Sequence, residues 1–378
     1  MTDHRPRTAA RPGAPAATTL DELVHESLLD RLGLVGDRAA RPLSAMQPGL
    51  RALRAAYETG EQPDFADPSL RGAYVLASHP HHCIIAAAVL GEIVPTWFPG
   101  ADGPAGGHTV TVLGAGPGAE AVGLVWALKQ AGIPVDTTTI HLVDREPGWA
   151  KSRRITLAAI DEILDGEPGP RIEHHVIDLT RPERRLRDLL ASSDLVIAQA
   201  VYSELAERGA VDHIVDHFTA RALFLIVEFP SGRHVVDRLP EGDLRILHRA
   251  SYSIRPPRAP AVLREHLFAD ADGLRARSRA LDVDARLVGR PGQRLPAPAT
   301  GAVRPSPDQA AAIAAFTRHL QGSASIFRLR GGAGTGKSAL YPALARIARE
   351  QGLSPVQLAP TGQAARRLRE RHGPPAHT

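Results

Sequence analysis

The stretch Val110-Thr111-Val112-Leu113-Gly114-Ala115-Gly116-Pro117-Gly118 decides the fold of this chain. An apolar strand over residues 109–113 runs into a turn that contains three glycines, and an apolar helix is expected over residues 119–130 with Gly132 as its C-cap. Glycine allows the backbone to turn tightly and lets a ligand approach where any Cβ would intrude, while the first turn of the helix offers free N–H groups. The stretch therefore predicts a nucleotide-type binding site.

Short apolar runs continue after this stretch and alternate with amphipathic segments, which indicates a parallel sheet covered by helices. These further strands are expected over residues 138–144, 172–178, 194–198 and 222–228. Polar residues mark three of the strand ends: Asp144, Asp178 and Gln199. Open sheets bind ligands at the carboxyl ends of their strands, and a carboxylate there can accept hydrogen bonds from both ribose hydroxyls.

The glycine stretch and the acidic strand ends together resemble class I S-adenosylmethionine-dependent methyltransferases over roughly residues 70–235. The resemblance implies a Rossmann-like methyltransferase sheet, with S-adenosylmethionine as the cofactor. It also implies that the glycine loop contacts the methionine part of the cofactor, Asp144 the ribose, and that Asp178 lies beside the adenine. The predicted cofactor-binding residues are Gly114, Ala115, Gly116, Gly118, Asp144, Asp178 and Gln199.

Two other interpretations of this site stay open. Gly114 to Ala119 also satisfies the G-x-G-x-x-A pattern of NAD(P)-dependent oxidoreductases, and a glycine-rich turn can exist without a ligand. Pro117-Gly118, the spacing to Asp144 and a third strand ending in Asp178 favour the methyltransferase. A methyltransferase-like domain that has lost catalysis and serves as a binding module is a further alternative.

The methyl acceptor is not identified by any motif. Enzymes of this class that methylate amino groups in nucleic acids usually carry Asn/Asp-Pro-Pro-aromatic after the fourth strand, where this chain has Gln199-Ala200-Val201-Tyr202. Covalent catalysis through Cys83 is not expected, because this cysteine lies upstream of the sheet. Methyl transfer needs in-line placement and in some enzymes a base, so Tyr202 and Glu204 are the catalytic candidates. A loop tyrosine and a surface carboxylate are the simpler interpretation of this pair.

A helical lead-in is expected before the sheet. Thr19 and Glu22 form a capping-box pattern for a helix that Gly33 ends, and helices are expected to continue to about residue 94. His79, His81, His82 and Cys83 could ligate a metal, but they read more simply as the start of an apolar helix with surface histidines and one buried thiol. After the sheet we expect a last strand pair near residues 234–254 and a helix over about 260–281.

A second nucleotide site is expected in the C-terminal segment. Residues 331–338 match G-x-x-x-x-G-K-[ST] after a short strand at 326–329 and before a helix over 338–350. In such a P-loop the backbone N–H groups surround a phosphate, the lysine bridges two phosphates and the hydroxyl coordinates Mg²⁺. The predicted ATP-binding residues are Gln309, Gly331, Gly334, Gly336, Lys337 and Ser338, with Ser338 as the ligand of the Mg²⁺ that accompanies ATP.

The sequence around this loop resembles the start of a RecD-like superfamily-one DNA helicase. The resemblance rests on Ser306-Pro307-Asp308-Gln309 and on Ala359-Pro360-Thr361-Gly362. It implies that Gln309 recognises adenine and that DNA is a candidate partner, although Ser306 with Gln309 is also a capping box. We expect an incomplete RecA-like domain without unwinding activity, whose missing helicase lobes belong to a longer protein.

The expected organisation has five parts: a disordered tail at 1–17, a helical lead-in at 18–100, the methyltransferase-like domain at 101–288, a proline-rich linker at 289–305 and the P-loop segment at 306–378. The 378 residues carry a net charge of only +4 and a single cysteine, which argues against a disulfide framework. No stretch predicts a membrane span, and a cytoplasmic location is expected. The fold class is α/β in both parts.

Overall fold

The computed structural model describes residues 19–97, 107–219, 222–232, 244–269, 279–290 and 307–320, and in addition residues 274, 276, 327, 340, 344, 347–348, 357–358 and 376–377. The expected tail and most of the linker lie outside these residues. So does the whole P-loop with Gly331, Gly334, Gly336, Lys337 and Ser338. Gln309 lies in the helix α14 (Pro307–Leu320), but its side chain is not described.

A seven-stranded sheet forms the centre of the molecule, with the strand order β3-β2-β1-β4-β5-β7-β6. Its first five strands are parallel to one another, whereas β7 is antiparallel to both of its neighbours. The strands are β1 (His108–Leu113), β2 (Thr138–Asp144), β3 (Arg171–Val176), β4 (Leu195–Gln199), β5 (Leu223–Glu228), β6 (Arg245–Ile254) and β7 (Leu281–Gly289). Five expected strands are thus confirmed, with ends that differ by no more than two residues, and the α/β fold class predicted from the sequence is confirmed.

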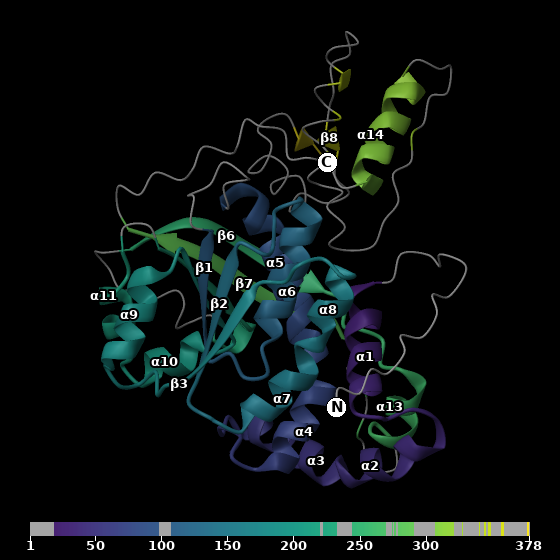
Figure 1. Ribbon diagram of the computed structural model, residues 1–378, viewed down its shortest axis with the longest axis vertical. Helices are drawn as coiled ribbons and strands as arrows, with labels where there is room; N and C mark the ends of the chain where they lie inside the picture. Colours follow the sequence, from purple (N-terminus) through teal and green to yellow (C-terminus); the bar gives the residue numbers. More distant parts are fainter. Residues whose placement is uncertain are drawn as a thin grey trace, which may run out of the picture.

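Helices cover both faces of this sheet (Figure 1). One face packs against α5 (His79–Trp97), α6 (Ala119–Ala131) and α8 (Ala158–Leu164), and the other against α9 (Arg184–Ser192), α10 (Tyr202–Glu207) and α11 (Val211–Asp216). The other helices are α1 (Leu20–Arg31), η1 (Gly36–Ala39), α2 (Ala40–Ala45), α3 (Gln47–Thr59), α4 (Pro68–Ala77), α7 (Trp149–Thr156), η2 (Pro230–Gly232) and α13 (Ala261–His266). The expected helical lead-in is therefore present as α1 to α5.

The lead-in is joined to the sheet through a close contact between α5 and α6. Gly123 of α6 faces Ala86 of α5, and a Cβ placed on Gly123 would lie 2.4 Å from the Ala86 Cβ. The two backbones approach this closely only because glycine has no side chain. Val89, Leu90 and Val122 are buried in the core cluster that covers this contact. The lead-in is thus part of the same hydrophobic core as the glycine loop.

The chain after β5 differs from the sequence prediction. The helix expected over 260–281 is wrong, because α13 ends at His266 and Leu281 begins strand β7. The sequence of β7 does alternate, because the apolar Leu281, Val283, Ala285 and Leu287 are separated by Asp282, Asp284 and Arg286, and this strand pattern was missed in the prediction. Strand β6 confirms one strand near 234–254, but it pairs with β7 rather than with a strand in that range.

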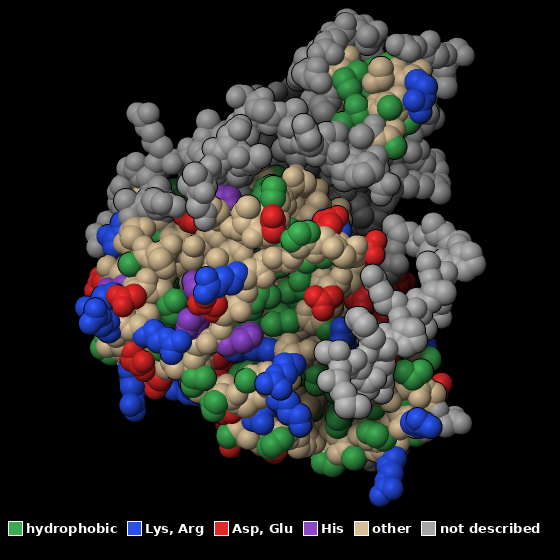
Figure 2. Space-filling model, viewed as in Figure 1, with side chains coloured by type: hydrophobic (Ala, Val, Ile, Leu, Met, Phe, Trp, Pro, Cys, Tyr) green, Lys and Arg blue, Asp and Glu red, His purple; other side chains and the backbone are tan. Residues whose placement is uncertain are grey.

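The face of the molecule drawn in Figure 2 mixes basic and acidic side chains, with histidines over the region where Figure 1 places β2 and β3. Within the described residues, no single helix has the length and apolar character needed to cross a membrane. Only α4 and α5, taken as a pair bent by 50°, pass that test.

Candidate functional site

The glycine loop follows β1 with the conformation that its sequence requires. Gly114, Gly116 and Gly118 all have positive φ angles, of 61°, 48° and 92°. A Cβ on Gly114 would lie 2.7 Å from Cγ2 of Val201, so this position has no space for a side chain. At Gly116 the nearest atom to such a Cβ is 3.9 Å away, in Trp149, so a side chain there is excluded by the backbone angle and not by space.

Asp144, at the end of β2, fixes the loop in this conformation. Its Oδ2 accepts a hydrogen bond from the backbone N–H of Gly116 at 2.8 Å, and its Oδ1 accepts one from that of Glu146 at 2.9 Å. Burial raises the pKa of this carboxyl, and these backbone hydrogen bonds oppose the shift. Each carboxylate oxygen has a second lone pair, so Asp144 can hold the loop and still accept hydrogen bonds from a ligand.

Helix α7 holds the same loop from its other side. Arg153 donates from Nε to the carbonyl oxygen of Gly116 at 2.7 Å, and the Thr156 hydroxyl donates to the carbonyl oxygen of Pro117 at 2.6 Å. Both side chains are buried. The N–H groups of the loop are also bonded within the protein, since Ala115 donates to the carbonyl oxygen of Val143 and Gly118 to that of Ala115, so the loop is held in one conformation from both sides.

Asp178 and Gln199, the other predicted strand-end residues, reach the same cavity as Asp144. Asp178 Oδ1 accepts hydrogen bonds from the hydroxyl and the N–H of Thr180, and the hydroxyl bond is the main cause of its lowered pKa. The Gln199 side-chain amide donates to the carbonyl oxygen of His82 at 3.1 Å, which links β4 to α5. A carbonyl oxygen can only accept, so this bond leaves Gln199 Oε1 as an acceptor, and that atom has no hydrogen-bond partner among the residues that the structure describes.

A cavity of about 590 Å³ lies over the carboxyl ends of β1, β2, β4 and β5. The helical lead-in closes one side of it with aromatic side chains that the sequence analysis did not identify. Phe65 and Tyr74 have ring centroids 5.3 Å apart, and Trp149 lies 5.1 Å from Phe65 and 5.7 Å from Tyr74. His82 stacks on Tyr74 at 5.8 Å and meets Phe229, beyond β5, at 6.0 Å. Phe, Trp and Tyr make up only 4% of the chain, and four of these residues, Phe65, Tyr74, Trp149 and Phe229, line this one side of the cavity.

Two buried carboxyls also line the cavity. Burial raises the pKa of Glu120, in the first turn of α6, to about 8, and within the described part of the chain its Oε2 has no hydrogen-bond partner. Burial likewise raises the pKa of Glu228, at the end of β5, although Glu228 accepts a hydrogen bond from the backbone N–H of Ser203 at 3.0 Å. Acidic residues are common in the first turn of helices because the helix dipole favours them there, so the sequence alone does not mark Glu120 as a binding residue.

The two catalytic candidates from the sequence are separated by the structure. Tyr202 is 1% exposed, packs against Phe224 at 6.0 Å and is not among the cavity-lining residues. Burial raises the pKa of Tyr202 to about 12. Glu204 does line the cavity, and it forms an ion pair with Arg208 at 3.6 Å. Between β4 and these residues, Ala200 has a φ of 56°, a left-handed angle that is unusual for alanine.

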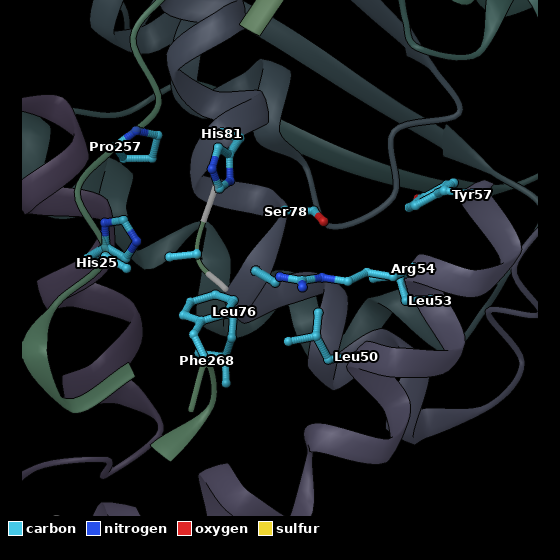
Figure 3. Close-up of a pocket in the computed structure, with 13 residues that line it drawn as sticks. His25, Leu50, Leu53, Arg54, Tyr57, Leu76, Ser78, His81, Pro257 and Phe268 are labelled. Carbon is cyan, nitrogen blue, oxygen red and sulfur yellow. The ribbon is translucent and has the colours of Figure 1, made fainter. Parts of the chain in front are cut away.

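The histidines at the start of α5 are not at the surface as expected. His79 and Cys83 are fully buried and in contact, with 3.4 Å between Cys83 Sγ and His79 Nε2. His81 and His82 line the cavity instead. A second cavity, of about 40 Å³, lies between the lead-in and the segment around α13, where His25, His81 and Phe268 face it (Figure 3). This volume holds about one or two water molecules.

A family model described as an AAA domain matches residues 304–378. Solved structures similar to the chain include one from Listeria monocytogenes described as a class I S-adenosylmethionine-dependent methyltransferase, with 10% identity and a TM-score of 0.39 over 87% of this chain and 98% of that chain. A predicted O-methyltransferase from Agrobacterium tumefaciens has 16% identity and a TM-score of 0.33 over 56% and 82% of the two chains. A methyltransferase from Methanosarcina mazei has 11% identity and a TM-score of 0.31 over 50% and 94%.

No curated protein sequence matches the chain. The P-loop segment predicted from residues 331–338 is confirmed by the family match. The chain thus combines an α/β domain built on a seven-stranded sheet with a C-terminal segment that matches the AAA-domain model.

Proposed function

We propose that the α/β domain binds S-adenosylmethionine in the cavity of about 590 Å³ and transfers its methyl group to an acceptor. The observation that carries the proposal is the convergence of the glycine loop, Asp144 and Asp178 on this one cavity. Asp144 would hold the ribose through its remaining lone pairs, and Asp178 would lie beside the adenine. Glu120 Oε2, for which the described residues supply no hydrogen-bond partner, would accept from the ammonium group of the methionine part.

The sheet itself favours this cofactor over NAD(P). Dinucleotide-binding folds repeat the βαβ unit and use the strand order 3-2-1-4-5-6, so that the second half of the sheet supports the second nucleotide. Here the second half contains the antiparallel β7 between β5 and β6. Aromatic side chains from the lead-in also occupy one side of the cavity, which suits a single nucleoside with a short charged arm.

Titration calorimetry with S-adenosylhomocysteine, and separately with NADH, tests the proposal. We expect saturable binding of S-adenosylhomocysteine and none of NADH. Asp178→Asn should weaken this binding with little change in fold, because the Asp178 side chain is 34% exposed. Asp188→Asn, on the exposed surface of α9, is the matched control. Binding of NADH in place of S-adenosylhomocysteine would move the assignment to the oxidoreductase.

We further propose that the P-loop segment binds ATP with Mg²⁺ through Lys337 and Ser338, in keeping with its family match, and that DNA is its partner. Lys337→Ala should remove ATP binding and leave the affinity for S-adenosylhomocysteine unchanged. Lys151→Ala, a lysine outside the loop, is the control. ATP binding that survives in Lys337→Ala would contradict the assignment.

A further inference from the structure

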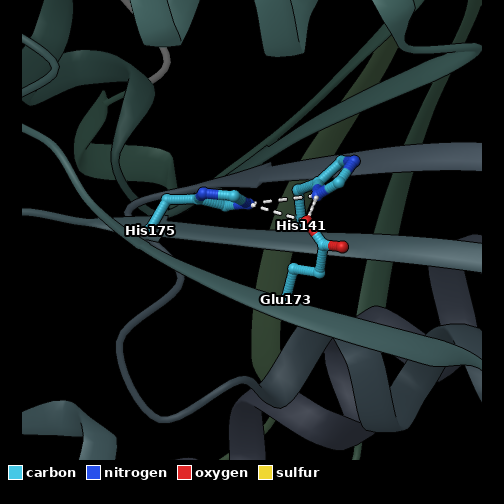
Figure 4. Close-up of side chains that lie close together, drawn as sticks. All are labelled: His141, Glu173 and His175. Atoms are coloured by element: carbon cyan, nitrogen blue, oxygen red, sulfur yellow. Dashed lines mark hydrogen bonds and ion pairs between the residues drawn. The ribbon is translucent and has the colours of Figure 1, made fainter.

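Three side chains with metal-ligating atoms meet on the face of the sheet that packs against α9, away from the cofactor cavity. His141 lies on β2, and Glu173 and His175 lie on β3. His141 pairs in register with Glu173, and Glu173 and His175 are two residues apart on one strand. Alternate residues of a strand share a face, so the backbone alone brings these three side chains together. Figure 4 shows them pointing toward one another from the two neighbouring strands.

The distances between the three ligand atoms match a tetrahedral centre. His141 Nδ1 lies 3.1 Å from His175 Nε2 and 3.4 Å from Glu173 Oε2, and His175 Nε2 lies 3.7 Å from the same Oε2. Two ligands bound at zinc distances of 2.0–2.1 Å in tetrahedral geometry are separated by about 3.4 Å. A single point about 2 Å from all three atoms therefore exists without any movement of the backbone.

We propose that His141, Glu173 and His175 bind a divalent transition-metal ion of the zinc class, with the fourth position open to water. Two imidazoles and one carboxylate suit zinc and its neighbours rather than calcium or magnesium. Glu173 is 31% exposed in its side chain, so the ion has access from solvent. The second carboxylate oxygen of Glu173 is held by Arg171, which orients the first toward the histidines. The ion would join the edge strand β3 to β2.

Arg185 competes with the ion for His175, and this competition can be tested by mutation. Its Nη2 donates to His175 Nδ1 at 2.9 Å, since arginine has only donors. The His175 proton therefore lies on Nε2, the atom that must ligate the metal. Arg185 is exposed, so its side chain can move into solvent while the proton moves to Nδ1. Metal and Arg185 thus compete for His175, and removal of Arg185 should tighten metal binding.

The experiment is a titration of the full chain, without an affinity tag, with Zn²⁺ and with Co²⁺, whose visible absorption reports tetrahedral coordination. One ion per chain is expected, with a rise in the melting temperature because the ion binds the folded state. His141→Ala and Glu173→Gln should each weaken binding by about tenfold or more, whereas His174→Ala, on the same strand but the opposite face, should retain it. Arg185→Ala should lower the Kd, and Arg184→Ala, its neighbour on α9, should not.

Equal Co²⁺ affinity in the wild-type chain and in both ligand variants would overturn the proposal, because the ion would then be held by other histidines. A featureless Co²⁺ spectrum would overturn it too. Weaker binding in Arg185→Ala would contradict coordination through His175 Nε2. Glu173→Gln keeps the shape of the side chain, so its loss of binding can be separated from unfolding by circular dichroism.

Discussion

The contact between α5 and α6 provides a stability prediction with an internal control. In Gly123→Ala the new Cβ would lie 2.4 Å from the Ala86 Cβ and 2.7 Å from the backbone nitrogen of Ala87. Ordinary carbon contacts are about 3.5–4.0 Å, so the overlap exceeds about 1 Å. Neither neighbour has a rotamer through which it could move away, so the helices themselves must shift. In α5, by contrast, a Cβ on Gly91 would meet no atom of the described residues within 4 Å.

The two substitutions should therefore change stability in opposite directions. Overpacking lowers the free energy of unfolding by about 1–3 kcal/mol, and Gly123→Ala should lie at the upper end of this range because its new Cβ meets atoms that cannot move aside. The higher helix propensity of alanine adds about 1 kcal/mol of stability in the opposite direction. We expect a net loss of about 2 kcal/mol for Gly123→Ala. Gly91→Ala should gain about 0.5–1 kcal/mol.

Urea unfolding followed by tryptophan fluorescence measures both variants. The three tryptophans lie at positions 97, 126 and 149, so their signal reports on the α/β domain and not on the P-loop segment. The midpoint should fall in Gly123→Ala and rise slightly in Gly91→Ala. A shift of the same sign and size in both would refute the close approach of the two helices.

Three further changes probe the cofactor site. Glu120→Gln should make the protein more stable than the wild type at pH 8, and this difference should shrink toward pH 5. The reason is that the pKa of Glu120 is about 8 in the folded protein, so the free energy of unfolding falls as the pH rises from the ordinary carboxyl pKa to that value, and glutamine does not titrate. Urea midpoints measured across this pH range test it. Thr180→Ala should raise the pKa of Asp178, whose main cause of lowering is the Thr180 hydroxyl, and carboxyl NMR titration would detect the shift. Ala200→Gly should increase the unfolding free energy by about 0.5–1 kcal/mol, because glycine adopts a φ of 56° without strain, and an unchanged or lower urea midpoint would contradict this.

The parallel half of the sheet could be predicted because its signals are local. Gly114 and Gly118 are needed where the chain turns out of β1, and Asp144 stands at the last position of β2, so each signal lies within a few residues of the structure that it specifies. The antiparallel half could not be predicted in this way. Strand β7 pairs with β5 and β6 through residues about 60 and 35 positions away. The alternation of apolar and charged residues over 281–287 indicates a strand, but no local signal gives its partners or its antiparallel direction.

The cavity likewise combines residues that local sequence signals predict with residues that only distant packing brings to the site. Its floor, with Asp144 and Asp178, was predicted as the cofactor site, and the structure brings these residues to one cavity. Its aromatic wall was not, because Phe65 and Tyr74 precede β1 by more than 30 residues and reach the site only through the packing of the lead-in helices. Tyr202 illustrates the opposite case: it follows β4 directly, but the helix α10 turns its side chain into the core beside Phe224.

The lead-in therefore has a role in the site as well as in the core. Gln199 at the end of β4 donates to His82 of α5, and the same helix α5 is in backbone contact with α6, which begins at the glycine loop. A shift of α5 would thus move the aromatic wall and the loop together. Because the wall and the floor share one rigid contact at Gly123, we expect Gly123→Ala to weaken S-adenosylhomocysteine binding as well as stability, whereas Gly91→Ala should leave that binding unchanged. Titration calorimetry on the two folded variants measures this coupling, and equal affinities in both would show that the wall adjusts independently of the loop.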